Sequence, residues 1–168
     1  MKNTAIIYSF NSVKSAKIAE KVQAAFNDKA IKMVNAEDIT EEEFMAYDNY
    51  ILGVPTWFDG ELPNYWDEFV PAIEDMKLKG KTFALYGLGD QKGYPENFLD
   101  AVGILGKLLE QQGGKLVGFT STDGYNFEGS NALRDNKFMG LAIDFENQGK
   151  MNNDRVTKWV DELKKEFG

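Results

Sequence analysis

The amino-acid sequence predicts an α/β fold, in which a parallel sheet is covered by helices on both faces. Short apolar runs typical of fully buried strands alternate with segments whose apolar residues recur at helical spacing. Such alternation favours a parallel sheet with helices as its crossover connections. The 168 residues are enough for one hydrophobic core, and no linker, repeat or low-complexity segment interrupts them. We therefore expect a single domain over residues 1–168.

The first half of the chain predicts three strands and two helices. Apolar runs typical of strands occupy residues 4–8, 31–34 and 49–54. Apolar residues at helical spacing predict a helix from about Ser15 to Phe26. A second helix should follow Pro63, a residue suited to a first helical turn. Pro71 should then kink or shorten it, because proline interrupts the helical hydrogen bonds.

The second half predicts the rest of the sheet and two more helices. A fourth strand is expected at 81–87, a fifth begins at 115–119, and a similar apolar run follows at 138–143. The stretch 120–137 is a long polar insertion that splits this last strand in two. Helical spacing predicts a helix at 98–112 and another at the C-terminus, where Asn153 or Asp154 should cap the first turn.

Composition narrows the function. The chain has neither cysteine nor histidine, so thiol nucleophiles, disulfides and the commonest zinc and acid–base groups are missing. This disfavours most hydrolytic mechanisms, and no metal site is expected. The net charge of −8, from 27 acidic and 19 basic residues, argues against nucleic-acid and anionic-membrane partners. Without a signal peptide or membrane-length apolar run, we expect a cytoplasmic monomer whose partners are proteins with basic surfaces.

Three unusual loops should meet at one edge of the sheet. They follow the first, third and fourth strands, at residues 9–15, 55–63 and 87–96. A strand order of 2-1-3-4-5 makes these strands neighbours and places a crevice between the first and the third. Crevices of this kind, outside the carboxyl ends of the strands, bind ligands in open α/β sheets.

The loops carry groups suited to a flat, phosphorylated ligand. Trp57 alone is more often a packing residue, and Asp90 alone a solvated turn residue. Together, however, Trp57 and Tyr94 flank one crevice and could stack on both faces of a planar ring. The hydroxyl-bearing loop from Ser9 to Ser15 precedes a helix, whose N-terminus favours a phosphate. A planar ring with a phosphate describes FMN.

Three longer segments resemble the long-chain flavodoxins: "GVPTWFDGELPNYW", "YGLGDQKGYPENF" and "STDGYNFEGSNALRDNKFMGLAIDFENQ". The likeness extends from the first strand to the terminal "VDELKKEFG". It implies a flavodoxin-like three-layer sandwich and non-covalently bound FMN. It also implies a low-potential carrier of single electrons between partner proteins, and therefore no enzymatic activity.

The resemblance assigns roles to individual residues. Trp57 corresponds to the inner ring-stacking residue and Tyr94 to the outer one. Glu146 stands near the expected ribityl chain, where the family often has Asp. The remaining contacts lie in the loops after the third and fourth strands, at Pro55, Thr56, Phe58, Asp59, Gly60, Leu88, Gly89 and Asp90.

The loop that should hold the phosphate departs from the family pattern, which typically reads Thr/Ser-x-Thr-Gly-x-Thr. Here Ser9 is followed by the matching residues Phe10, Asn11, Ser12, Val13, Lys14 and Ser15. Phe10 lacks the first hydroxyl, and Val13 replaces glycine with a β-branched residue that avoids positive φ. Ser12 and Ser15 keep two hydroxyls, and backbone amides remain available whatever the side chains. We therefore expect a remodelled phosphate site, with a lost site as the alternative.

Other functions compete with an FMN carrier. The principal alternative is a protein-binding module of the same fold that has lost or weakened FMN binding. A phosphate-accepting receiver domain shares the topology but needs acidic residues after the first strand, where this chain has "YSFNS". A quinone reductase of related fold would need a nicotinamide site, for which we find no motif.

Overall fold

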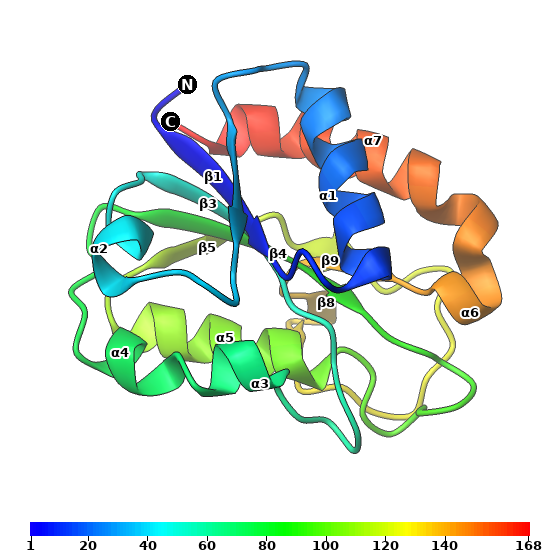
Figure 1. Ribbon diagram of the computed structural model, residues 1–168. Helices are drawn as coiled ribbons and strands as arrows, with labels where there is room; N and C mark the ends of the chain where they lie inside the picture. The colour runs from blue at the N-terminus through cyan, green and yellow to red at the C-terminus, as the bar shows by residue number, and fades with distance from the viewer.

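The computed structural model describes residues 1–168 and contains a parallel sheet in the order β2-β1-β3-β4-β5 (Figure 1). Every neighbouring pair in this sheet is parallel, as the sequence predicts. The strands are β1 (Thr4–Tyr8), β2 (Lys32–Asn35), β3 (Asn49–Gly53), β4 (Thr82–Leu88) and β5 (Lys115–Val117). The predicted strand order is therefore confirmed.

The last strand of the sheet is divided by the insertion. β5 pairs with the first half of β4, and β9 (Leu141–Ile143) pairs with the second half. Between them the chain forms a small antiparallel sheet of β6 (Thr120–Ser121), β7 (Leu133–Arg134) and β8 (Lys137–Phe138). The predicted split of strand five is confirmed, although each half is shorter than its apolar run.

Helices cover both faces of the sheet. α1 (Val13–Phe26) and α7 (Asn152–Glu166) lie side by side on one face (Figure 1). The other face carries α3 (Asn64–Asp67), α4 (Val70–Glu74) and α5 (Asp100–Gln111). Each face has its own apolar core, because the strands between them are buried on both sides. No helix has the length and apolar character needed to span a membrane.

Prolines and caps explain where several helices begin and end. Pro63 immediately precedes α3, and Pro71 lies in the first turn of α4, so the expected helix is broken into two short ones. α1 begins at Val13, two residues earlier than predicted, with Ser12 as its N-cap. The sequence analysis missed α2 (Glu41–Phe44), in which the Thr40 side chain accepts a hydrogen bond from the amide of Glu43.

The predicted cap of the C-terminal helix was wrong. Asn153 and Asp154 lie inside α7, which begins at Asn152 and has no side-chain cap. The helix continues directly from α6 (Phe145–Gln148) and the 3-10 turn η1 (Gly149–Met151). This turn supplies a backbone acceptor, the carbonyl of Gly149, to the amide of Asn152.

Candidate functional site

A cavity of about 300 Å³ lies at the carboxyl ends of β1, β3 and β4. The structure thus brings the three unusual loops together around one space. Its walls are Ser12, Lys14, Pro55, Thr56, Trp57, Leu88, Gly89, Asp90, Tyr94, Phe145 and Glu146. A second hollow of about 270 Å³ shares Trp57 and Tyr94 and extends to Phe58. Ten of the residues proposed from the sequence line the first cavity, and Phe145 is the one lining residue that was not proposed.

A tight turn holds Trp57 at the cavity. The backbone amides of Trp57 and Glu61 each donate to the other residue's carbonyl, at 2.8 and 2.7 Å. Phe58 and Gly60 close the turn with positive φ angles of 51° and 96°. A non-glycine residue in this region is uncommon and often marks a functional site. Phe58 is 70% exposed, so the turn projects an apolar ring into solvent.

Asp90 and Tyr94 stand on a turn fixed by hydrogen bonds. The Asp90 carboxylate accepts from the amide of Gly93 at 2.8 Å and from the Asn147 side chain at 2.8 Å. These two hydrogen bonds lower the pKa of Asp90. A Cβ at Gly93 would lie 2.5 Å from an Asp90 oxygen, so a larger residue there would displace this carboxylate. Tyr94, which is 53% exposed, is left free to cover a ligand.

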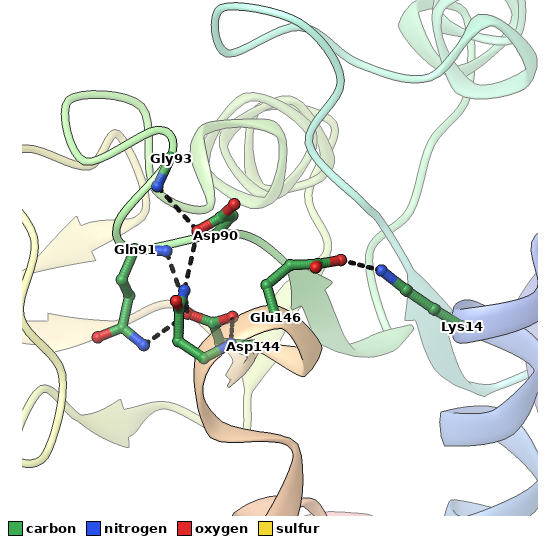
Figure 2. Close-up of polar contacts among 7 residues, drawn as sticks. Lys14, Asp90, Gln91, Gly93, Asp144 and Glu146 are labelled. Carbon is green, nitrogen blue, oxygen red and sulfur yellow. Dashed lines mark hydrogen bonds and ion pairs between the residues drawn. The ribbon is translucent and has the colours of Figure 1, made fainter.

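A buried carboxylate that sequence reasoning missed supports this turn. Asp144 is inaccessible to solvent and accepts hydrogen bonds from the backbone and side-chain amides of Gln91 and of Asn147, at 2.8 to 3.1 Å (Figure 2). The Gln91 side-chain oxygen in turn accepts from the amide of Asn126, in the insertion. The local signal was an Asp three residues before Asn147, an N-cap pattern for α6.

The first turn of α1 presents unused hydrogen-bond donors. The amides of Val13, Lys14 and Ser15 have no acceptor within the chain, as expected for the first turn of a helix. The Ser15 hydroxyl is buried and also lacks a partner. Buried polar groups are normally satisfied, so this hydroxyl is a candidate donor to a bound ligand. Four donors at the N-terminus of a 14-residue helix fit a phosphate.

Residues 9–11 of the same loop make their hydrogen bonds away from the cavity. The Ser9 hydroxyl and the Asn11 side chain both donate to Glu37, at 2.6 and 2.8 Å, and thereby lower its pKa. The Phe10 amide donates to the Asn35 side chain at 3.2 Å. The polar groups of residues 9–11 therefore bind the end of β2 and the segment after it. The amides of residues 13–15 remain unpaired, and Ser12 and Lys14 line the cavity.

An ion pair spans the cavity between Lys14 and Glu146 (Figure 2). Lys14 comes from α1 and Glu146 from α6, so the pair joins segments that are 132 residues apart. The Lys14 ammonium also lies 5.9 Å from the centre of the Phe145 ring. Both partners are about half exposed, so the pair is free to exchange its contacts for those of a ligand.

Comparisons with known proteins agree with this geometry. The flavodoxin family model matches residues 6–159. The chain is 40% identical to the flavodoxin of Nostoc sp. (strain PCC 7120 / SAG 25.82 / UTEX 2576), over 99% of this chain and 98% of that one. It is 37% identical to the flavodoxin of Klebsiella pneumoniae, over 98% of both chains.

A solved structure gives the same result. The Fusobacterium nucleatum flavodoxin bound to flavin mononucleotide superposes with a TM-score of 0.95 at 33% identity, covering 100% of both chains. The predicted resemblance is thereby confirmed over the whole chain. This protein belongs to the flavodoxin family.

Proposed function

We propose that this protein binds one FMN between Trp57, Tyr94 and the first turn of α1, and carries single electrons at low potential between partner proteins. Family membership makes FMN the cofactor and electron transfer, not enzymatic turnover, the activity. The observation that carries the placement is the group of four unpaired donors formed by the Ser15 hydroxyl and the amides of residues 13–15. It disfavours the alternative of a module that has lost FMN.

Bound FMN supplies the electron chemistry, and the chain positions and tunes it. Trp57 and Tyr94 would pack on the ring and exclude water from its faces. Asp59, Glu61 and Asp90, in a chain of net charge −8, disfavour added negative charge nearby. This lowers the reduction potential, by about 59 mV for each tenfold loss in affinity for the reduced state. The carbonyl of the Phe58–Asp59 peptide would accept a hydrogen bond from an N–H group at the edge of the flavin ring.

The exposed surface beside the cavity fits a basic partner. Four exposed acidic residues lie on the turn and at the end of α3: Asp59, Glu61, Asp67 and Glu68. Their charge would steer a positively charged protein toward the exposed edge of the flavin. We propose redox partners with basic docking surfaces, approached by a monomeric, cytoplasmic carrier.

Absorbance and stoichiometry test the proposal. Protein purified without added flavin should carry the visible bands of a flavin, and the apoprotein should titrate to one FMN per chain. A reductive titration should then resolve single-electron steps at low potential. An apoprotein that binds no FMN in an equilibrium titration would instead support the protein-binding module.

A further inference from the structure

A second pocket lies away from the flavin cavity, between the insertion and α7. It encloses about 410 Å³, within the range of small-molecule sites. We call it the α7 pocket, and its walls are Phe119, Thr120, Ser121, Asp123, Tyr125, Leu141, Arg155, Lys158, Trp159 and Glu162. It shares no residue with the flavin cavity. Three aromatic rings and one leucine form its apolar part, beside two cationic and two acidic side chains.

Arg155 has no hydrogen-bond acceptor in this pocket. Its guanidinium carbon lies 4.0 Å from the centre of the Tyr125 ring, which fixes the group by a cation–π contact. Its Nη1 atom is buried without a partner, and none of the three ion pairs in the structure includes it. A stacked ring satisfies none of the N–H groups, so a buried guanidinium nitrogen is left unpaired at a free-energy cost.

The other arginine of the chain shows what is missing. Arg134 likewise lies over an aromatic ring, 5.8 Å from the centre of Phe119. It also makes two hydrogen bonds to the carboxylate of Glu110, at 2.7 and 2.6 Å. This paired, fork-like contact is the arrangement that a guanidinium favours with a carboxylate. Arg155 makes the corresponding contact with the Tyr125 ring but is not paired with a carboxylate.

The nearby acidic side chains do not fill this role. Asp123 and Glu162 line the α7 pocket, but neither lies within ion-pair distance of Arg155. Glu162 is paired with Lys165, at 3.0 Å. No carboxylate of the chain is paired with Arg155, so its N–H groups are open to an acceptor from a ligand, and the apolar wall favours one attached to a flat, apolar body.

We propose that the α7 pocket binds a small aromatic carboxylate. Arg155 would hold the carboxylate through its unpaired N–H groups, with Lys158 as a second cation. The aromatic body would pack against Phe119 and Trp159. This inference is independent of the FMN site, and the anion would bind despite the net charge of −8.

The test uses the FMN-loaded protein, so that the flavin cavity is occupied. Benzoate, 1-naphthoate and indole-3-acetate are titrated to millimolar concentration while the indole N–H signals are followed by NMR. The Trp159 indole lies in the pocket wall and should shift, whereas that of Trp66, which donates to the Gly53 carbonyl, should not. The neutral 1-naphthamide should bind more weakly than 1-naphthoate.

Variants assign any binding to Arg155. Arg155→Gln should weaken the tightest carboxylate by about tenfold or more, because charge-assisted hydrogen bonds are lost. Arg155→Lys keeps the charge but not the forked guanidinium, so its affinity for the carboxylate should lie between those of the parent and Arg155→Gln. Lys164→Gln removes a charge from the same helix outside the pocket and should have no effect. Flavin absorbance verifies that each variant is folded. The proposal is overturned if no carboxylate shifts Trp159, if Arg155→Gln binds as the parent does, or if 1-naphthamide binds equally well.

Discussion

The Asp144 carboxylate accepts two hydrogen bonds from Gln91, one from its backbone amide at 3.1 Å and one from its side-chain amide at 2.8 Å. Asp144 directly follows β9, and Gln91 belongs to the turn after β4 that carries Asp90 and Tyr94. The two neighbouring strand ends are thereby joined behind the flavin cavity. The position of the outer aromatic residue thus depends on a buried carboxylate that does not line the cavity.

Replacement of Asp144 should destabilise both the fold and the site. Asp144→Ala leaves donors of Gln91 and Asn147 unpaired, and each buried unsatisfied donor costs roughly 1–3 kcal/mol. We expect the free energy of unfolding of the apoprotein, measured in urea, to fall by roughly 2–4 kcal/mol. FMN affinity should fall as well. Asp161→Ala removes an exposed carboxylate from α7 and should change neither quantity. Equal stability of the two variants would contradict this role.

The unpaired hydroxyl of Ser15 should serve the phosphate. FMN should bind more tightly than riboflavin, and Ser15→Ala should weaken FMN by about ten- to a hundredfold, since a hydrogen bond to a charged group contributes roughly 1.5–3 kcal/mol. Riboflavin affinity should not change. The apoprotein should lose no stability, because the hydroxyl has no partner there. An equal loss for both ligands in equilibrium titrations would show that Ser15 acts on the ring or on folding.

Trp57 and Tyr94 should quench the fluorescence of bound FMN, because both line the cavity where the ring would stack. Tyr94→Leu should weaken FMN by roughly 1 kcal/mol, or about fivefold, and restore part of the emission. Tyr94→Phe keeps the ring and is the matched control. Fluorimetric titration gives affinity and quenching together. Fully emissive flavin at saturating protein would rule out this placement of the two aromatic residues.

Electron transfer to a basic partner should depend on salt. The Debye length falls from about 30 Å at 0.01 M to about 10 Å at 0.1 M ionic strength, so the rate should drop steeply over this range. Neutralising Asp67 and Glu68 together, as Asp67→Asn with Glu68→Gln, should flatten the dependence. The matched double variant Asp154→Asn with Asp161→Asn lies on the opposite face of the sheet and should not. If stopped-flow rates of electron transfer do not change with ionic strength, electrostatic steering is ruled out.

Acid should remove the contribution of Asp90 to stability. Its pKa in the folded chain lies below the ordinary value of 3.8, because Gly93 and Asn147 donate to the charged form. A group with a lowered pKa stabilises the fold above its unfolded value, and this contribution is lost as pH falls through the folded pKa. The parent apoprotein should therefore exceed Asp90→Asn in stability near neutral pH, by a margin that shrinks below about pH 4. Urea unfolding of the two proteins, at neutral pH and below pH 4, measures this difference in stability. A difference that does not change with pH would contradict the lowered pKa of Asp90.

Much of the fold follows from local patterns in the sequence. Continuous apolar runs indicate strands buried on both faces, and consecutive parallel strands require crossover helices between them. Pro71 could be expected to break a helix, because a proline in a helix interior removes a backbone hydrogen bond. The three loops could be placed at one edge since the carboxyl ends of parallel strands coincide. α2 escaped detection because one turn carries too little periodicity.

Only the tertiary structure decided how the polar groups are paired. Ser9 and Asn11 look like phosphate ligands in the sequence, but the pairing of Tyr8 with Asn35 brings Glu37 within reach of both. Asp144 meets Gln91 across 53 residues because β9 completes the strand that β5 begins. The Ser15 hydroxyl, by contrast, is buried and has no partner within the chain. Hydrogen bonds of this kind depend on strand register and on ångström-scale distances between distant segments, which local periodicity does not encode.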